Sequence, residues 1–135
     1  MECPKAANEE ALKLLNAGVD ALGLCIASEN FSAADLDTLL AGIHIPAIEL
    51  TFCGEHPAAV AELFLAKVEK EGIAKEDVHA NFCIDPLVKG LTSKGDFCSE
   101  NGAKCFARIA ELVKKTKEYK HIRVVTVSGH IFSNA

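Results

Sequence analysis

The sequence predicts an α/β fold made of parallel (β/α) units, part of a TIM-type (β/α)8 barrel. Short apolar segments of strand length alternate with amphipathic segments of helix length along all 135 residues. Because a helix that joins two successive strands brings them back parallel, this alternation indicates a parallel sheet. Eight strands need about 250 residues, so we expect residues 1–135 to be a single fragment, about half of a barrel domain. An open doubly wound sheet is the competing architecture.

The order of elements begins with a helix. Asn8 can cap this helix, its apolar positions share one face, and Gly18 ends it. Residues 20–26 form a short apolar run that predicts a buried strand. Ser32 and, three places later, Asp35 resemble a capping box at the start of the second helix.

Two further strands follow, with a helix between them. Gly42 stops the second helix, and residues 47–53 predict the second strand. Pro57 suits the first turn of the third helix, and Gly72 follows its end. Residues 78–84 predict the third strand.

The last third of the chain starts with the longest irregular segment, residues 87–98. Ser99 then opens a long helix, and residues 122–129 predict the fourth strand. The apolar stripe of that helix is expected to consist of Cys105, Phe106, Ile109, Leu112 and Val113.

One face of every predicted strand carries small or polar side chains. By the two-residue period of a strand, this face contains Gly23, Cys25, Ala27, Glu49, Thr51, Cys53, His79, Asn81, Cys83, Val124, Thr126 and Ser128. Bulky branched side chains fill the interior of an ordinary barrel, so small polar ones would leave a hollow for water or a thin ligand. The pattern also fits a two-layer α/β sheet with a solvent-exposed face, and the period alone does not separate these two interpretations.

The charge and the apolar runs argue against nucleic-acid and membrane partners. The net charge is −5, whereas nucleic-acid-binding domains normally carry a basic surface. The lysines between positions 114 and 120 suit the negative end of a helix and predict a solvated face. No apolar run reaches the roughly 18 residues of a membrane span, and Met1–Lys5 lacks the apolar region of a signal peptide. We therefore expect a cytoplasmic protein.

The six cysteines are Cys3, Cys25, Cys53, Cys83, Cys98 and Cys105. No Cys-x-x-Cys pair supports a zinc-ribbon or thioredoxin-type site. Cys25, Cys53 and Cys83 come near the ends of three successive strands on one face, where three thiols could bind a soft metal or carry redox chemistry. Because no histidine or acid stands at ligand spacing, small buried thiols in the reduced state are the favoured interpretation.

Four collinear segments between about Leu36 and Ala135 resemble the substrate-barrel domain of the methylmalonyl-CoA mutases. These segments are Leu39–Ile43, Glu71–Ile73, Ala80–Asp85 and Val127–Ala135. The resemblance implies a (β/α)8 barrel lined with small hydrophilic residues, with the pantetheine arm of the acyl-CoA along its axis. On that basis the residues expected to line the substrate channel are Thr51, Cys53, Asn81, Cys83, Thr126, Ser128 and His130.

Several functional groups of the catalytic subunit of that family are missing from this chain. His130 and Ile131 stand where the family has tyrosine and histidine, and Cys83 stands where it has a substrate-contacting glutamine. Residues 86–105 contain no arginine, although the family's carboxylate-binding arginine should fall there. The pattern resembles the non-catalytic small subunit of the two-chain form. We therefore expect no catalytic residue and no metal ligand in this chain.

The resemblance also implies partners. The chain would pair with a catalytic large subunit in a heterodimer that interconverts methylmalonyl-CoA and succinyl-CoA in propionate metabolism. Adenosylcobalamin would belong to the holoenzyme and not to this fragment, because no stretch matches the family's cobalamin-binding motif Asp-x-His-x-x-Gly. In isolation, half a barrel with two open sheet edges is expected to form a homodimer. The alternative is an independent small α/β protein with a thiol or metal site.

Overall fold

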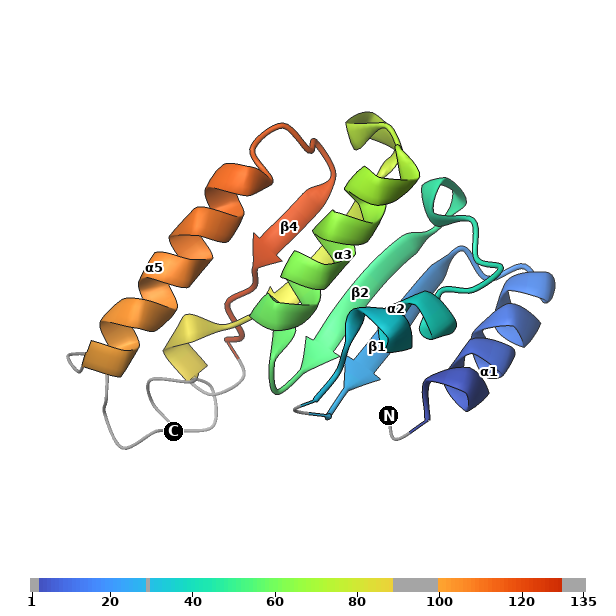
Figure 1. Ribbon diagram of the computed structural model, residues 1–135, viewed down its shortest axis with the longest axis horizontal. Coiled ribbons are helices and arrows are strands. Elements are labelled where there is room, and N and C mark those ends of the chain that lie inside the picture. Colours follow the sequence, from blue (N-terminus) through green and yellow to red (C-terminus); the bar gives the residue numbers. More distant parts are fainter. Residues whose placement is uncertain (1–2, 29, 89–99, 130–135) are drawn as a thin grey trace.

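One parallel sheet forms the centre of the molecule. The computed structural model describes residues 3–28, 30–88 and 100–129 (Figure 1). The four strands are β1 (Ala21–Ile26), β2 (Glu49–Gly54), β3 (His79–Ile84) and β4 (Ile122–Val125). They are ordered β1-β2-β3-β4, and every neighbouring pair is parallel. The sheet therefore follows the chain order expected for the wall of a barrel.

The helices cover one face of this sheet. They are α1 (Pro4–Asn16), α2 (Ala33–Leu39), α3 (Pro57–Glu71) and α5 (Glu100–Lys115), and short 3-10 turns at Ile45–Ala47 and Lys75–Asp77 lead into β2 and β3. Successive helices contact one another in chain order, and Figure 1 shows them side by side in front of the strands. In a doubly wound sheet, helices would cover both faces. That alternative is wrong for the described part of the chain.

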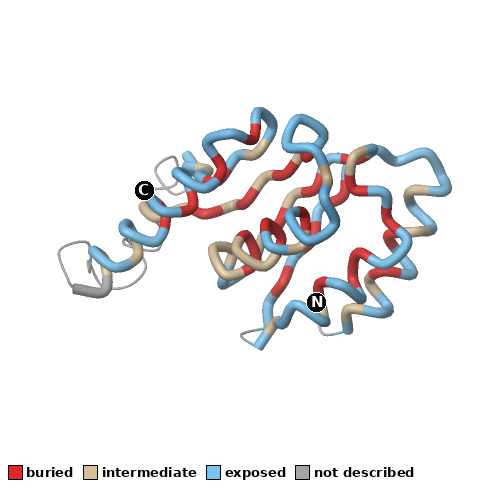
Figure 2. Tube along the Cα trace, turned by 45° about the horizontal axis from the view of Figure 1, so that its top comes forward, coloured by how far each residue is buried: buried red, intermediate tan, exposed pale blue. Residues whose placement is uncertain are grey.

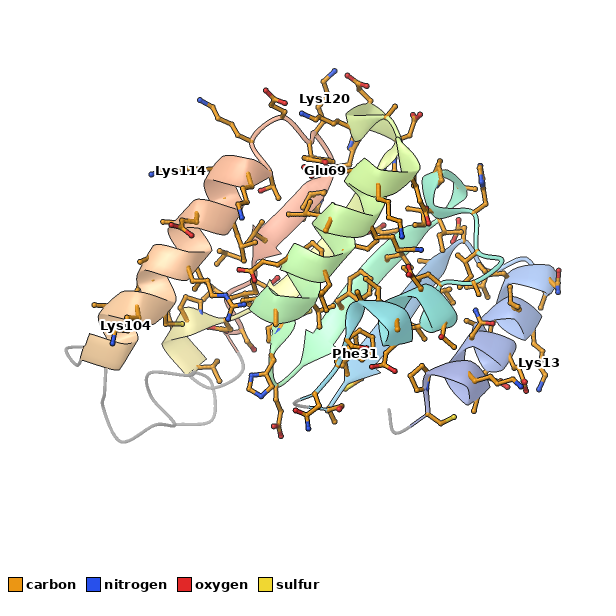
Figure 3. The ribbon with its side chains drawn as sticks, in the orientation of Figure 1. Lys13, Phe31, Glu69, Lys104, Lys114 and Lys120 are labelled. Carbon is orange, nitrogen blue, oxygen red and sulfur yellow. The ribbon has the colours of Figure 1, made fainter. Side chains whose placement is uncertain are left out.

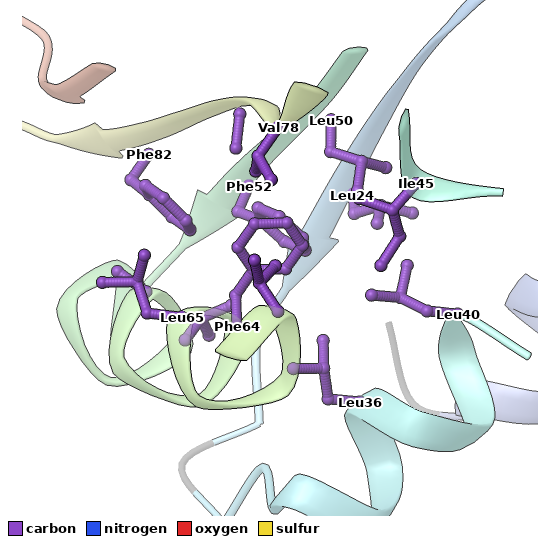
Figure 4. Close-up of a cluster of buried hydrophobic side chains, with 14 of the residues drawn as sticks. Leu24, Leu36, Leu40, Ile45, Leu50, Phe52, Phe64, Leu65, Val78 and Phe82 are labelled. Carbon is purple, nitrogen blue, oxygen red and sulfur yellow. The ribbon is translucent and has the colours of Figure 1, made fainter. Parts of the chain in front are cut away.

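The core lies between the sheet and this helical layer. Along β1 and β3, every second residue is buried, as the alternating colours of the strands in Figure 2 show. Phe52, Phe64 and Phe82 meet at its centre with ring centroids 5.2 to 5.8 Å apart (Figure 4). All three rings are fully buried, and such aromatic pairs stabilise a core beyond the area that they bury. The buried face of each strand is thus the one that faces the helices.

Several local signals in the sequence have the predicted effect. Ser32 and Asp35 form a capping box, in which each side chain accepts a hydrogen bond from the other residue's backbone N–H. Gly72 ends α3 in the left-handed conformation, with φ at 67°. Gly54 ends β2 with φ at 135°, and a Cβ there would lie 1.9 Å from the Ile26 carbonyl oxygen. The close approach of β1 and β2 at this end therefore requires glycine.

The prediction for Asn8 is wrong. Helix α1 begins at Pro4, so Asn8 lies inside it, and its side-chain amide donates hydrogen bonds of 2.8 Å to the carbonyl oxygens of Leu39 and Ala41. These two carbonyls lie at and just past the end of α2, where helices leave carbonyl groups unpaired. Asn8 therefore joins α1 to the end of α2.

The predictions for the last helix and the last strand are partly wrong. Strand β4 ends at Val125 and not at residue 129, and Val124 is buried on the helix side, not on the polar face. On α5, Ile109 and Leu112 are buried, but Phe106 and Val113 are 43% and 47% exposed. Since α5 is the last helix of the layer, no described helix lies beyond it to cover these two side chains. Figure 3 shows Lys114 and Lys120 pointing outward at this end, as predicted for a solvated face.

Candidate functional site

The predicted site residues of β2 and β3 lie on the face of the sheet that no described helix covers, which we call the open face. Thr51, Cys53, Asn81 and Cys83 alternate along their strands with fully buried phenylalanines and are themselves half-buried. Thr51 and Asn81 are direct partners in the β2–β3 register. The open face therefore brings together the small polar side chains that the strand period had grouped.

The segment after β4 joins this group through Thr126. Its backbone N–H donates to the Ile84 carbonyl oxygen at 3.1 Å, and its hydroxyl donates to the side-chain oxygen of Asn81 at 3.3 Å. The β3–β4 register is irregular between Asn81 and Ile84. Val124 is buried on the helix side, whereas Thr126 lies beside Asn81 on the open face. The structure thus places Thr126 beside Asn81 on the open face, where the strand period had predicted it.

Two of the predicted residues touch directly. The Cys53 thiol donates a hydrogen bond to the Cys83 sulfur over 3.0 Å, and both side chains are half-buried. Burial and then the neighbouring Cys53 raise the pKa of the Cys83 thiol to about 11. Cys83 is therefore a protonated thiol at neutral pH, a poor nucleophile in its resting state.

Asp85 is a residue whose full role the sequence did not indicate. Its Oδ1 accepts hydrogen bonds from the backbone N–H groups of Leu87 and Val88, and its Oδ2 accepts one from Ser128. Burial acts to raise the pKa of this carboxyl, but the three donors outweigh burial and hold the pKa below its ordinary value. Asp85 thus directly follows β3 and holds Ser128 at the edge of the open face. His130 lies outside the described residues.

The residues that come nearest to the family's cobalamin-binding motif do not fit the cofactor. Asp77 and His79 have the spacing of its first two positions, but the glycine position is taken by Phe82, which is fully buried in the core. The His79 ring stacks on the His121 ring with centroids 4.4 Å apart, at the opposite end of the sheet from the thiols.

Within residues 3–28, 30–88 and 100–129, no group of three or more histidine, cysteine or acidic side chains is placed to hold a metal ion. In the same residues, no helix combines the length and the apolar character that a membrane span needs.

Comparison with known proteins gives one informative similarity. No family model matches the chain. Over 87 residues, the chain is 38% identical to the methylmalonyl-CoA mutase small subunit of Porphyromonas gingivalis. The match covers 63% of this chain, and the chain spans only 14% of the length of that relative. The predicted resemblance is therefore confirmed: the chain is similar to a short part of a methylmalonyl-CoA mutase small subunit.

Proposed function

We propose that this chain forms part of the barrel wall of a methylmalonyl-CoA mutase small subunit and contributes structure, not catalysis. The observation that carries the proposal is the division of the sheet into two unlike faces. Helices cover one face, and small polar side chains line the other. A closed sheet with this division would enclose a hydrophilic channel, and the similarity to a mutase small subunit supports the proposal that this channel takes an acyl-CoA.

The side of the molecule formed by β4 and α5 supports continuation into a further (β/α) unit. Phe106 and Val113 lie seven residues apart on α5 and are both exposed, and Val125 and Val127 are 41% and 57% exposed on the last strand segment. A next strand would pair with β4, and its helix would pack on α5, covering these apolar groups. The matched relative is several times longer than this chain, so a subunit of that length has room for such a unit.

The open face offers groups suited to the arm of an acyl-CoA. Asn81 has an amide that donates and accepts hydrogen bonds, and Thr51 and Thr126 have hydroxyls that do both. The amide groups of a pantetheine arm need such partners when they leave water. We propose that these side chains, with Cys53, Cys83, Ser128 and His130, line the channel in the complete barrel.

The proposed non-catalytic role follows from the chemistry of the same face. Cys83, which stands at the family's glutamine position, is a half-buried thiol with a raised pKa and is only a weak hydrogen-bond donor. A catalytic large subunit, with which this protein would form a cytoplasmic heterodimer, would supply the reacting groups and hold adenosylcobalamin. The holoenzyme would interconvert methylmalonyl-CoA and succinyl-CoA.

The test is to express the full-length protein with and without the catalytic large subunit of the same source. We expect a stable one-to-one complex on size-exclusion chromatography, with mutase turnover only when the large subunit is present. Turnover by the full-length protein alone, or failure to bind the large subunit, would overturn the proposal.

A further inference from the structure

The contact between Cys53 and Cys83 has no part in the proposed structural role. The two sulfur atoms lie 3.0 Å apart on neighbouring parallel strands, with 30 positions between them in the chain. Their positions follow directly after Phe52 and Phe82, which are register partners. The two thiols therefore meet across the end of the β2–β3 ladder, on the open face of the sheet.

This geometry suits a covalent bond. Neighbouring strands lie about 4.7 to 4.9 Å apart, and disulfides join residues whose Cα atoms are about 4.4 to 6.8 Å apart. A disulfide bond is about 2.05 Å long, so the two sulfur atoms need to approach by about 1 Å. Side-chain rotation supplies a movement of this size while the sheet stays in place.

We propose that Cys53 and Cys83 form an oxidisable dithiol, a modification site at which a small-molecule disulfide such as oxidised glutathione produces a cross-strand disulfide. The proposal does not depend on the role in a mutase suggested above. The site would link β2 and β3 covalently at the edge of the open face, beside Asn81. It would also remove the S–H groups of both side chains from that face.

The reaction is a pair of thiol–disulfide exchanges. The Cys53 thiolate attacks one sulfur of oxidised glutathione, the glutathione S–S bond breaks, and one glutathione leaves and takes up a proton. The Cys83 thiolate then attacks the Cys53 sulfur, the protein S–S bond forms, and the second glutathione leaves and is protonated. Two protein thiols lose two electrons and two protons, and one glutathione disulfide gains them.

The raised pKa of Cys83 determines how the site responds to pH. In this order of steps, and equally in the reverse order, Cys83 must attack as a thiolate. Because burial raises its pKa to about 11, the thiolate is scarce at neutral pH. The disulfide should therefore form slowly near pH 7 and faster as the pH rises. Cys25, which is exposed and pairs in register with Cys53, is the thiol that competes with Cys83 for a disulfide bond to Cys53.

The experiment is non-reducing peptide mapping by mass spectrometry after the full-length protein has been incubated with oxidised glutathione. We expect a linked pair of peptides that contain Cys53 and Cys83, and recovery of both thiols with dithiothreitol. The linkage should disappear in Cys53→Ser and in Cys83→Ser and persist in the matched control Cys25→Ser. Its rate of formation should rise by about tenfold per pH unit between about pH 7 and pH 9, as the thiolate fraction of Cys83 does.

Three outcomes would overturn the proposal. The first is that Cys53 and Cys83 accumulate only as separate mixed disulfides with glutathione. The second is that Cys25 and Cys53 form the main linkage, and the third is a rate of linkage that does not change with pH. Mapping of the unsubstituted protein is sufficient for the first two, so the test does not depend on whether the serine variants fold.

Discussion

The side-chain Oδ2 of Asp85 accepts a 2.7 Å hydrogen bond from the backbone N–H of Ser128, which lies 43 positions later in the chain. The other oxygen of the same carboxylate accepts from Leu87 and Val88 and so fixes the turn that follows β3. One side chain therefore holds the ends of two neighbouring strands in place. The hydrogen bond to Ser128 helps to hold the segment after β4 at the edge of the open face.

Asp85→Ala should lower the free energy of unfolding by about 1 to 2 kcal/mol. The substitution removes the acceptor at the start of a helical turn and leaves the Ser128 N–H without its partner. Urea unfolding followed by circular dichroism measures the change. The control is Glu10→Ala, which removes an exposed ion pair with Lys13 at 3.5 Å and should cost less than about 0.5 kcal/mol. Equal effects of the two variants would contradict the role of Asp85.

The contribution of Asp85 to the free energy of unfolding should decrease as the pH falls. Its pKa is lower in the folded chain than its ordinary value of 3.8, so folding favours the ionised form. The contribution is fully present above about pH 5 and is lost as the pH falls through the folded pKa. The difference in unfolding free energy between the unsubstituted protein and Asp85→Ala should therefore shrink on acidification. Other carboxyls with lowered pKa values, such as those of Asp37 and Glu62, affect both proteins alike.

Much of the fold could be predicted because the strands follow a simple rule. Burial on one face gives each strand a two-residue period, and β3, predicted at residues 78–84, is found at His79–Ile84. The capping box of Ser32 and Asp35 and the left-handed Gly72 are likewise decided by residues close in sequence. The same period predicted that Thr51, Cys53, Asn81 and Cys83 would share a face.

The errors arise where distant parts of the chain decide the structure. Asn8 was predicted to be a cap, but its amide bonds to carbonyls 31 and 33 positions away, and no local pattern contains that information. Val124 was assigned to the polar face, but its neighbour Arg123 pairs in register with Asn81 of that face, and Val124 is buried on the helix side. The hydrogen bond from Ser128 to Asp85 also depends on how β3 and β4 pair, which is a property of the sheet and not of either segment.

The aromatic cluster should dominate the stability of the core. Phe82→Ala removes a fully buried ring that contacts Phe52 and Phe64, and should lower the free energy of unfolding by about 3 to 5 kcal/mol. Phe106→Ala, at a position that is 43% exposed, is the matched control and should cost less than about 1 kcal/mol. Comparable losses for the two variants would mean that Phe106 is covered in solution.

The isolated chain of residues 1–135 should be a homodimer. Strands β1 and β4 are the two edges of the sheet, and Val125 and Val127 expose apolar surface at one of them. Light scattering coupled to size-exclusion chromatography should give about twice the monomer mass of 14.4 kDa. Val125→Lys should shift the protein toward the monomer, because a charged edge residue disfavours pairing. Ala34→Lys, on the exposed side of α2, should not. A monomeric unsubstituted chain would contradict the prediction.

Chemical access to Cys25 in the full-length protein tests most directly whether the open face is the inside of a barrel. In the described chain, Cys25 is an exposed residue of that face. The measurement is its rate of alkylation by iodoacetamide, relative to a cysteine introduced by Lys114→Cys on the outer surface of α5, with the fully unfolded protein as reference for both. If further strands close the barrel, Cys25 should react at least about tenfold more slowly than the introduced cysteine, since the channel shields it. Equal rates would show that the open face remains in contact with solvent, as in a two-layer α/β protein, and would contradict the proposed role in a barrel wall.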